Sequence, residues 1–226
     1  VGRSLLKSSG VVSAMTMISR VFGLIRDMVI AFFFGAGAEA DVFFLAFKIP
    51  NFFRRLFAEG AFSQAFVPVL SEYRTQQGPA EVQRLIDRVS GTLGIILVLI
   101  TVIGILGAAG LISVFAAGFV YHGEAYKVTL ATEMLRLTFP YLLFISLTAF
   151  AGAILNSFGR FAAPAFTPVI LNLTLIGAAI WLRPLMAVPV MALAWGVLLA
   201  GMLQLVFLLP FLRSAGLLPV PRVDFK

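Results

Sequence analysis

The sequence predicts an all-α integral membrane protein with six transmembrane helices. Of its 226 residues, 61% are hydrophobic and 12% are charged, whereas soluble domains average about 45–50% apolar and about 25% charged residues. The mean hydropathy of the chain is +1.04. Six apolar stretches in the sequence reach the length that a bilayer-spanning helix needs, which is about 20 residues.

The six predicted spans are residues 11–34, 41–71, 89–116, 128–155, 162–182 and 188–212. The third, fifth and sixth contain no charged residue, so we expect ordinary bilayer-spanning helices there. The third also contains Gly104, Gly107 and Gly110, small residues that allow helices to pack closely. The fourth contains Arg136, whose long side chain either reaches the membrane surface or joins a polar site.

The first two spans differ from the others because each contains three or more ionisable residues. The first contains Arg20, Arg26 and Asp27, and the second contains Asp41, Lys48, Arg54, Arg55 and Glu59. One Arg or Lys at the centre of a spanning helix costs roughly 2.5–3.5 kcal/mol. These side chains must therefore face water, one another or a bound anion, and charges inside a membrane indicate a functional site by default.

Two interpretations of these charges are open. On a helical wheel Arg20 and Asp27 fall within about 20° of each other, whereas Arg26 lies about 120° from Arg20, so the charges cannot all share one wall. In the first interpretation, ion pairs such as Arg20 with Glu59 or Asp27 with Arg55 neutralise the charges and only fix the packing of the helices. In the other interpretation the surplus cations line a water-filled cavity for an anion, and the planar fork of arginine suits phosphate oxygens.

The connections between the predicted spans are short. Residues 35–40 form a tight turn, and 73–88 form the longest connection. Within it, residues 81–88 are predicted to form an amphipathic helix that leads into the third span. Four prolines lie inside or near the ends of apolar segments, where a proline removes a backbone hydrogen bond and kinks the helix: Pro50, Pro68, Pro140 and Pro210. Broken helices of this kind border the binding sites of many transporters.

The distribution of Lys and Arg predicts the orientation in the membrane, because cytoplasmic loops are enriched in both. The predicted connections and termini on one side contain Arg3, Lys7, Arg74, Arg84, Arg88, Arg160, Arg213, Arg222 and Lys226. Those on the opposite side contain Lys127 and Arg183. Both ends of this chain are therefore predicted to be cytoplasmic, with membrane lipids around the spans.

The composition excludes several classes of function. The absence of cysteine excludes disulfides and thiolate metal sites, and the single histidine, His122, excludes a histidine metal cluster. The sequence contains no G-x-x-x-x-G-K-S/T loop for ATP. Its net charge of +7 suggests nucleic acid, but the basic residues are spread over loops and spans and do not form a groove. We therefore expect no cofactor, no metal, no nucleic acid and no catalytic residue.

Two segments of the chain resemble the MurJ (MviN) family of lipid II flippases. The first, Ser19 to Tyr73, reads SRVFGLIRDMVIAFFFGAGAEADVFFLAFKIPNFFRRLFAEGAFSQAFVPVLSEY. The second, Phe139 to Leu173, reads FPYLLFISLTAFAGAILNSFGRFAAPAFTPVILNL. The string RRLFAEGAFSQAFVP is long and specific, and the similarity extends over nearly all of the chain.

The resemblance implies one lobe of an exporter fold in which two six-helix lobes form a V-shaped cavity. Residues 1–226 are expected to be the N-terminal lobe, and the second lobe is absent from this chain. The family moves the undecaprenyl-pyrophosphate-linked peptidoglycan precursor, lipid II, from the inner to the outer leaflet of the bacterial cytoplasmic membrane. We expect the complete protein to be a monomer that works by alternating access.

The resemblance also implies which residues bind the substrate. Arg20, Arg26 and Arg54 match cavity positions that the family associates with the pyrophosphate, and Ser19 and Asp27 match further cavity positions. The other candidate substrate-binding residues are Asp41, Lys48, Arg55 and Glu59. Two alternatives stay open: an exporter of another polyprenyl-linked saccharide or of a drug, and a membrane scaffold that binds lipid intermediates without moving them.

Overall fold

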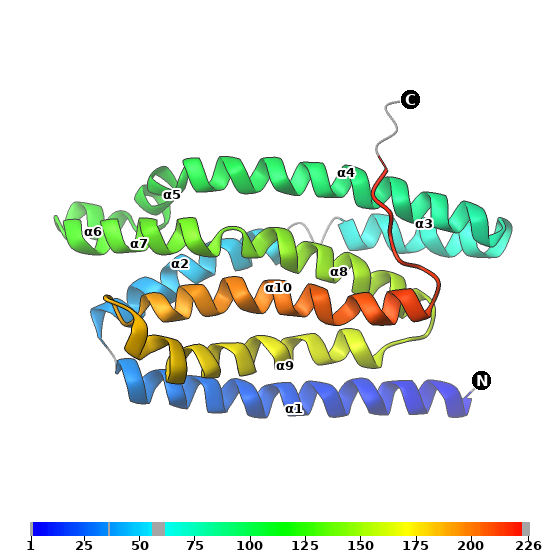
Figure 1. The fold of residues 1–226 in the computed structure, drawn as a ribbon, viewed down its shortest axis with the longest axis horizontal. Helices are drawn as coiled ribbons and strands as arrows, with labels where there is room; N and C mark the ends of the chain where they lie inside the picture. The colour runs from blue at the N-terminus through cyan, green and yellow to red at the C-terminus, as the bar shows by residue number, and fades with distance from the viewer. Residues whose placement is uncertain (1, 36, 56–61, 223–226) are drawn as a thin grey trace.

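Every described element of the chain is helical. The computed structural model describes residues 2–35, 37–55 and 62–222, and no strand occurs among them. The elements in chain order are α1 (Gly2–Phe34), α2 (Ala38–Arg54), α3 (Phe62–Gln76), α4 (Pro79–Leu106), α5 (Ala108–Phe115), α6 (Ala117–Tyr121), α7 (Ala125–Thr138), α8 (Tyr141–Ser157), α9 (Ala162–Gly177), the π-helical turn η2 (Ala178–Leu182), the 3-10 turn η3 (Arg183–Leu185) and α10 (Met191–Ser214). The long helices run roughly side by side in an elongated bundle (Figure 1). The predicted all-α membrane fold is confirmed.

Among the described residues, four helical runs are long and apolar enough to cross a membrane. They are Pro79–Leu106, Ala125–Ser157, Ala162–Leu185 and Met191–Ser214, which overlap the third to sixth predicted spans. α1 covers the first predicted span with 33 residues, but the charges of Arg20, Arg26 and Asp27 lower its apolar character. The second predicted span corresponds to α2 and α3, with residues 56–61 outside the described chain. The count of six spans therefore stays a prediction.

The connection predicted over residues 73–88 is mostly helical. α3 continues to Gln76 and α4 begins at Pro79, so the predicted helix 81–88 is the first part of α4 and not a separate element. Proline favours this start because the first position of a helix needs no backbone N–H donor.

The third predicted span is interrupted. α4 ends at Leu106, Gly107 departs from helical geometry (φ −84°, ψ 6°), and α5 follows. Gly104 lies against the ring of Phe139 so closely that an added Cβ would overlap it, which is the close packing that a small residue allows. Gly110 does not serve this purpose, because no atom lies within 4 Å of the place where its Cβ would be.

The four predicted proline positions have different effects. Pro68 and Pro210 lie inside α3 and α10, and both helices continue through them. Pro50 is buried inside α2, and the helix continues through it to Arg54. Pro140 lies between α7 and α8 and divides them. Because proline has no backbone N–H to continue the hydrogen-bond ladder, the fourth predicted span consists of two helices in one apolar run.

α8 and α10 lie at the centre of the bundle (Figure 1). α10 packs against α8 and α9, whereas α1 packs along α9 and α4 packs along α8. Small residues allow the central helices to approach. A Cβ at Gly201 would lie 2.8 Å from Cδ2 of Tyr141, and a Cβ at Gly196 would lie 2.7 Å from Cβ of Ala178. α1 and α4 therefore form opposite edges of the bundle.

After α10 the chain turns back across α4. Gly216 has a φ of +69°, a left-handed conformation that glycine adopts without steric cost. Residues 217–222, which we call the strap, then run across α4 (red in Figure 1). The buried carboxylate of Asp87 accepts a hydrogen bond from the backbone N–H of Val220 at 2.9 Å. The backbone N–H of Arg222 donates to the carbonyl of Asp87 at 3.1 Å.

Several of the described cations predicted to face the cytoplasm lie at one end of the bundle (Figure 1). There Arg160 donates to the carbonyl of Phe211 near the end of α10, and Arg74 of α3 donates to the carbonyl of Ser157 at the end of α8. The two cations predicted for the opposite side lie in α7 and η3, at the other end (Figure 1). The direction in which this bundle crosses the membrane stays a prediction.

Candidate functional site

A hollow of about 680 Å³ lies between α1, α2, α8, α9 and α10. Two of its walls carry a cation, Arg26 from α1 and Arg54 from α2. The other polar residues on its lining are Asn51, Tyr141, Thr148, Asn156, Thr167 and Gln204. No acidic residue is among the described residues that line it. We call this hollow the cationic cavity.

Arg26 is held on both sides by hydrogen bonds. Its Nη1 donates to Oδ1 of Asn172 in α9 at 3.0 Å. Its Nε and Nη2 donate to Oδ1 of Asp27 at 2.9 Å and 2.7 Å. The Arg26 side chain is 24% exposed and that of Asp27 is 56% exposed. The guanidinium therefore has a fixed position at the edge of the cavity, and its ion pair lies toward solvent.

The packing of α1 on α9 decides which charges of α1 face the cavity. Nδ2 of Asn172 donates to the backbone carbonyl of Ser19 at 3.0 Å, and Gly23 is close enough that a Cβ there would be 3.7 Å from the same nitrogen. Ser19, Gly23 and Arg26 are spaced by four and three residues, so they share one helix face. Arg20 lies outside that face and is exposed.

α2 presents two faces that carry polar residues. Phe47, Asn51 and Arg54 line the cationic cavity, and Nε of Arg54 donates to Oδ1 of Asn51 at 2.9 Å. Lys48 and Arg55 each follow a cavity residue by one position, which rotates them about 100° around the helix. They line a separate hollow of about 410 Å³ together with Asn51, Phe52 and Phe115.

Gln204 adds a polar group that the analysis of charges missed. It is 2% exposed, and its Nε2 donates to the carbonyl of Thr167 at 2.8 Å. Its Oε1 is buried and has no hydrogen-bond partner among the described residues. A buried acceptor without a partner is costly, and this one belongs to a residue on the cavity lining.

The remaining predicted site residues lie elsewhere. Asp41 is exposed in the first turn of α2. It is ten residues before Asn51, which corresponds to roughly 15 Å along a helix. Glu59 lies outside the described residues, and so does its suggested pairing with Arg20. Asp27 pairs with its neighbour Arg26 and not with Arg55.

The structure thus places Arg26 and Arg54 on the lining of one cavity, and Lys48 and Arg55 on the lining of the separate hollow. It adds three amides, Asn51, Asn172 and Gln204, to the site. The fifth and sixth predicted spans are long and apolar enough to cross a membrane, and each also contributes one buried amide to the site, Asn172 and Gln204. The sequence signal for Asn172 and Gln204 is an uncharged amide inside an otherwise apolar span, since such groups hydrogen-bond between helices.

Comparison with known proteins agrees with this architecture. Residues 30–226 match the family model described as lipid II flippase MurJ. The chain is 51% identical to a probable lipid II flippase MurJ of Vibrio cholerae, over 100% of this chain and 44% of that protein. It is 47% identical to a probable lipid II flippase MurJ of Haemophilus influenzae, over 92% of this chain and 42% of that protein.

A third relative, the lipid II flippase MurJ of Burkholderia cenocepacia, is 46% identical over 92% of this chain and 40% of that protein. The chain therefore spans less than half the length of these curated relatives. The family match covers most of the chain, and the identities far exceed what unrelated apolar helices would share. By these criteria the chain belongs to the lipid II flippase MurJ family.

Proposed function

We propose that this chain is the N-terminal lobe of a lipid II flippase and that its cationic cavity binds the pyrophosphate of the substrate. The observation that carries the proposal is the convergence of Arg26 and Arg54, from two different helices, on one hollow with no acidic residue among its described lining. Membership of the MurJ family supplies the substrate class. In this proposal the protein is a transporter and not an enzyme.

Arginine suits this role for a physical reason. Its guanidinium is planar, keeps its charge, and donates two parallel hydrogen bonds to phosphate oxygens. Arg26 is already oriented by Asn172 and Asp27, so little side-chain freedom would be lost on binding. Arg54 is oriented by Asn51 in the same way. The unpartnered Oε1 of Gln204 offers an acceptor for a hydroxyl or amide of the substrate headgroup.

The transport cycle requires the rest of the protein. This chain corresponds to 44% of the length of the Vibrio cholerae relative, so we propose that a second six-helix lobe closes the cavity from the other side. α1 lies at an edge of the bundle (Figure 1) and exposes Arg20, Met17 and Met28. This face of α1 is where the second lobe would approach, and rocking of the lobes would open the cavity first inward and then outward.

The membrane supplies a driving force in this scheme. We place the protein in the bacterial cytoplasmic membrane with both ends of this chain in the cytoplasm, as the Lys/Arg distribution predicts. An anionic headgroup that leaves the cytoplasm moves down the usual inside-negative potential. The gain is about 2.3 kcal/mol per charge per 100 mV, so export would not need ATP.

The test is complementation of cells depleted of their own lipid II flippase, with the translocated precursor measured directly. We expect the full-length protein with Arg26→Ala or Arg54→Ala to reach the membrane at normal levels and to fail in translocation. Arg26→Lys should retain part of the activity, because the charge remains and the two parallel hydrogen bonds are lost. Arg84→Ala is the matched control, since Arg84 pairs with Glu81 on the surface of α4.

Full activity of Arg26→Ala and Arg54→Ala would show that these charges only fix the packing. This result would favour one of the alternative readings, an exporter of another substrate or a scaffold. Rescue by residues 1–226 alone would instead mean that two copies of this lobe assemble into a working transporter.

A further inference from the structure

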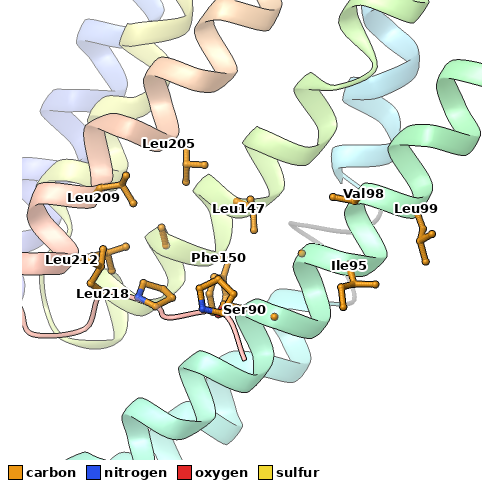
Figure 2. A pocket seen from close by; sticks show the side chains of 15 residues that line it. Ser90, Ile95, Val98, Leu99, Leu147, Phe150, Leu205, Leu209, Leu212 and Leu218 are labelled. Atoms are coloured by element: carbon orange, nitrogen blue, oxygen red, sulfur yellow. The ribbon is translucent and has the colours of Figure 1, made fainter. Parts of the chain in front are cut away.

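A second hollow lies on the side of α8 that faces away from the cationic cavity. It has a volume of about 510 Å³ and is bounded by α4, α8 and α10, with the strap across one end. Figure 2 shows side chains of α10 on one side and of α4 on the other, with Leu147 and Phe150 of α8 between them. We call it the α4–α10 groove. Ser90 is the one polar side chain among its described lining residues, and its hydroxyl donates to the carbonyl of Asp87.

The groove and the cationic cavity use different faces of the same helices. On α8, Thr148 lines the cavity and Leu147 lines the groove; on α10, Gln204 lines the cavity and Leu205 lines the groove. If the second lobe closes over the cavity, as proposed above, the groove is left facing lipid. Its α4 edge is suited to that environment, because Ile95 is 43% exposed and Leu99 is 57% exposed.

The end of the groove at the strap is cationic. Pro219 and Pro221 of the strap belong to the lining, and the strap ends at Arg222, whose side chain is 67% exposed. Arg222 Nε lies 3.9 Å from Oδ2 of Asp87, a distance too long for a strong ion pair. Arg88 lies one helical turn before Gly91, a lining residue, and is also exposed. An apolar channel with arginines at its mouth is complementary to an acyl chain that ends in an anionic headgroup.

We propose that the α4–α10 groove binds one acyl chain of an anionic phospholipid of the cytoplasmic leaflet, with its phosphate beside Arg222 and Arg88. The volume falls within the roughly 300–1,000 Å³ of ordinary small-ligand sites. Apart from Ser90, the described side chains of the lining offer no hydrogen-bonding groups, which an extended peptide backbone in this position would need. The lipid would hold the strap against α4.

A glycine in the groove allows a direct test. Gly94 lines the groove, and no atom lies within 4 Å of the position of an added Cβ. Gly94→Phe would therefore fill the groove without displacing the backbone. Gly110→Phe is the matched control, because Gly110 is also a helical glycine with open space at its Cβ but lies in α5, outside the groove.

The experiment uses the full-length protein in membranes that contain phosphatidylglycerol with a photoreactive group in one acyl chain. We expect labelled peptides from α4 and α10 around Ile95 and Leu209. Gly94→Phe should reduce this labelling about tenfold, because the loss of even two buried methylene groups has an effect of that size. Gly110→Phe should leave it unchanged. Phosphatidylglycerol should also compete better than phosphatidylcholine, and Arg222→Gln should reduce that preference.

Equal labelling in Gly94→Phe and Gly110→Phe would overturn the proposal. Crosslinks confined to other helices, or protection of the groove by the second lobe, would overturn it as well. If the double variant Arg222→Gln/Arg88→Gln still prefers phosphatidylglycerol, the proposed contact between the headgroup and these arginines is wrong. Because labelling does not require translocation, failure of this proposal is distinguishable from failure of the flippase proposal.

Discussion

Replacing Asn172 by aspartate separates a functional role of Arg26 from a structural one. Asn172 is 5% exposed and accepts a hydrogen bond from Arg26 while it donates one to the carbonyl of Ser19. Asn172→Asp keeps the shape of the side chain and places a negative charge against the guanidinium. If Arg26 only fixes the packing, this new ion pair is tolerated. If Arg26 binds an anion, the carboxylate competes with the substrate.

The expected magnitudes differ for stability and for binding. The variant replaces the donor to the Ser19 carbonyl by an acceptor, which leaves that carbonyl unpaired at a cost of about 1–3 kcal/mol. It also gains a charge-assisted bond to Arg26 that is roughly twice as strong as a neutral one. Because these effects partly offset, the folding free energy should change by less than about 2 kcal/mol. For a phosphate on the remaining N–H groups of Arg26, about 6 Å from the new carboxylate, the repulsion at an effective dielectric constant near 20 is about 2.8 kcal/mol, or roughly 100-fold in affinity.

The assay is translocation of the precursor in flippase-depleted cells, with the amount of protein in the membrane measured in parallel. We expect Asn172→Asp to accumulate normally and to lose nearly all translocation. Gln77→Glu is the matched control, since Gln77 is exposed between α3 and α4, outside the cavity, so water and salt screen the new charge. Wild-type translocation by Asn172→Asp at normal abundance would refute the anion-binding role of Arg26.

Two further predictions concern stability. Gly104→Ala should lower the unfolding free energy by about 1–3 kcal/mol, because the methyl group would overlap the buried Phe139 ring. Gly110→Ala should be neutral or stabilising by up to about 1 kcal/mol, because its site is open. Denaturant unfolding in detergent measures both free energies, and equal effects would contradict the packing described for Gly104. Asp87→Ala should release the strap, since the Val220 N–H loses its acceptor. Hydrogen exchange at the Val220 amide should become about 10–100-fold faster, whereas Asp87→Asn should keep most of the protection. Unchanged exchange in Asp87→Ala would show that other contacts hold the strap.

Much of the fold follows from residue types alone. The apolar stretches predict the helices, because a chain inside a bilayer must satisfy its own backbone hydrogen bonds. Where the prediction is wrong, local chemistry explains the difference. α4 begins earlier than expected because Pro79 is a favourable first helical residue. The predicted break at Pro140 is present, because proline cannot continue the hydrogen-bond ladder.

The candidate site could be predicted only in part. The sequence by itself determines that the first two spans carry costly charges, that these charges need partners, and that the chain resembles one family. The tertiary structure alone decides which charges meet. The contact of α1 with α9 through Ser19 and Asn172 turns Arg26 toward the cavity and leaves Arg20 exposed. A helical wheel gives the angles between residues of one helix but not the rotation of that helix against its neighbours, which the packing of residues far apart in the chain sets.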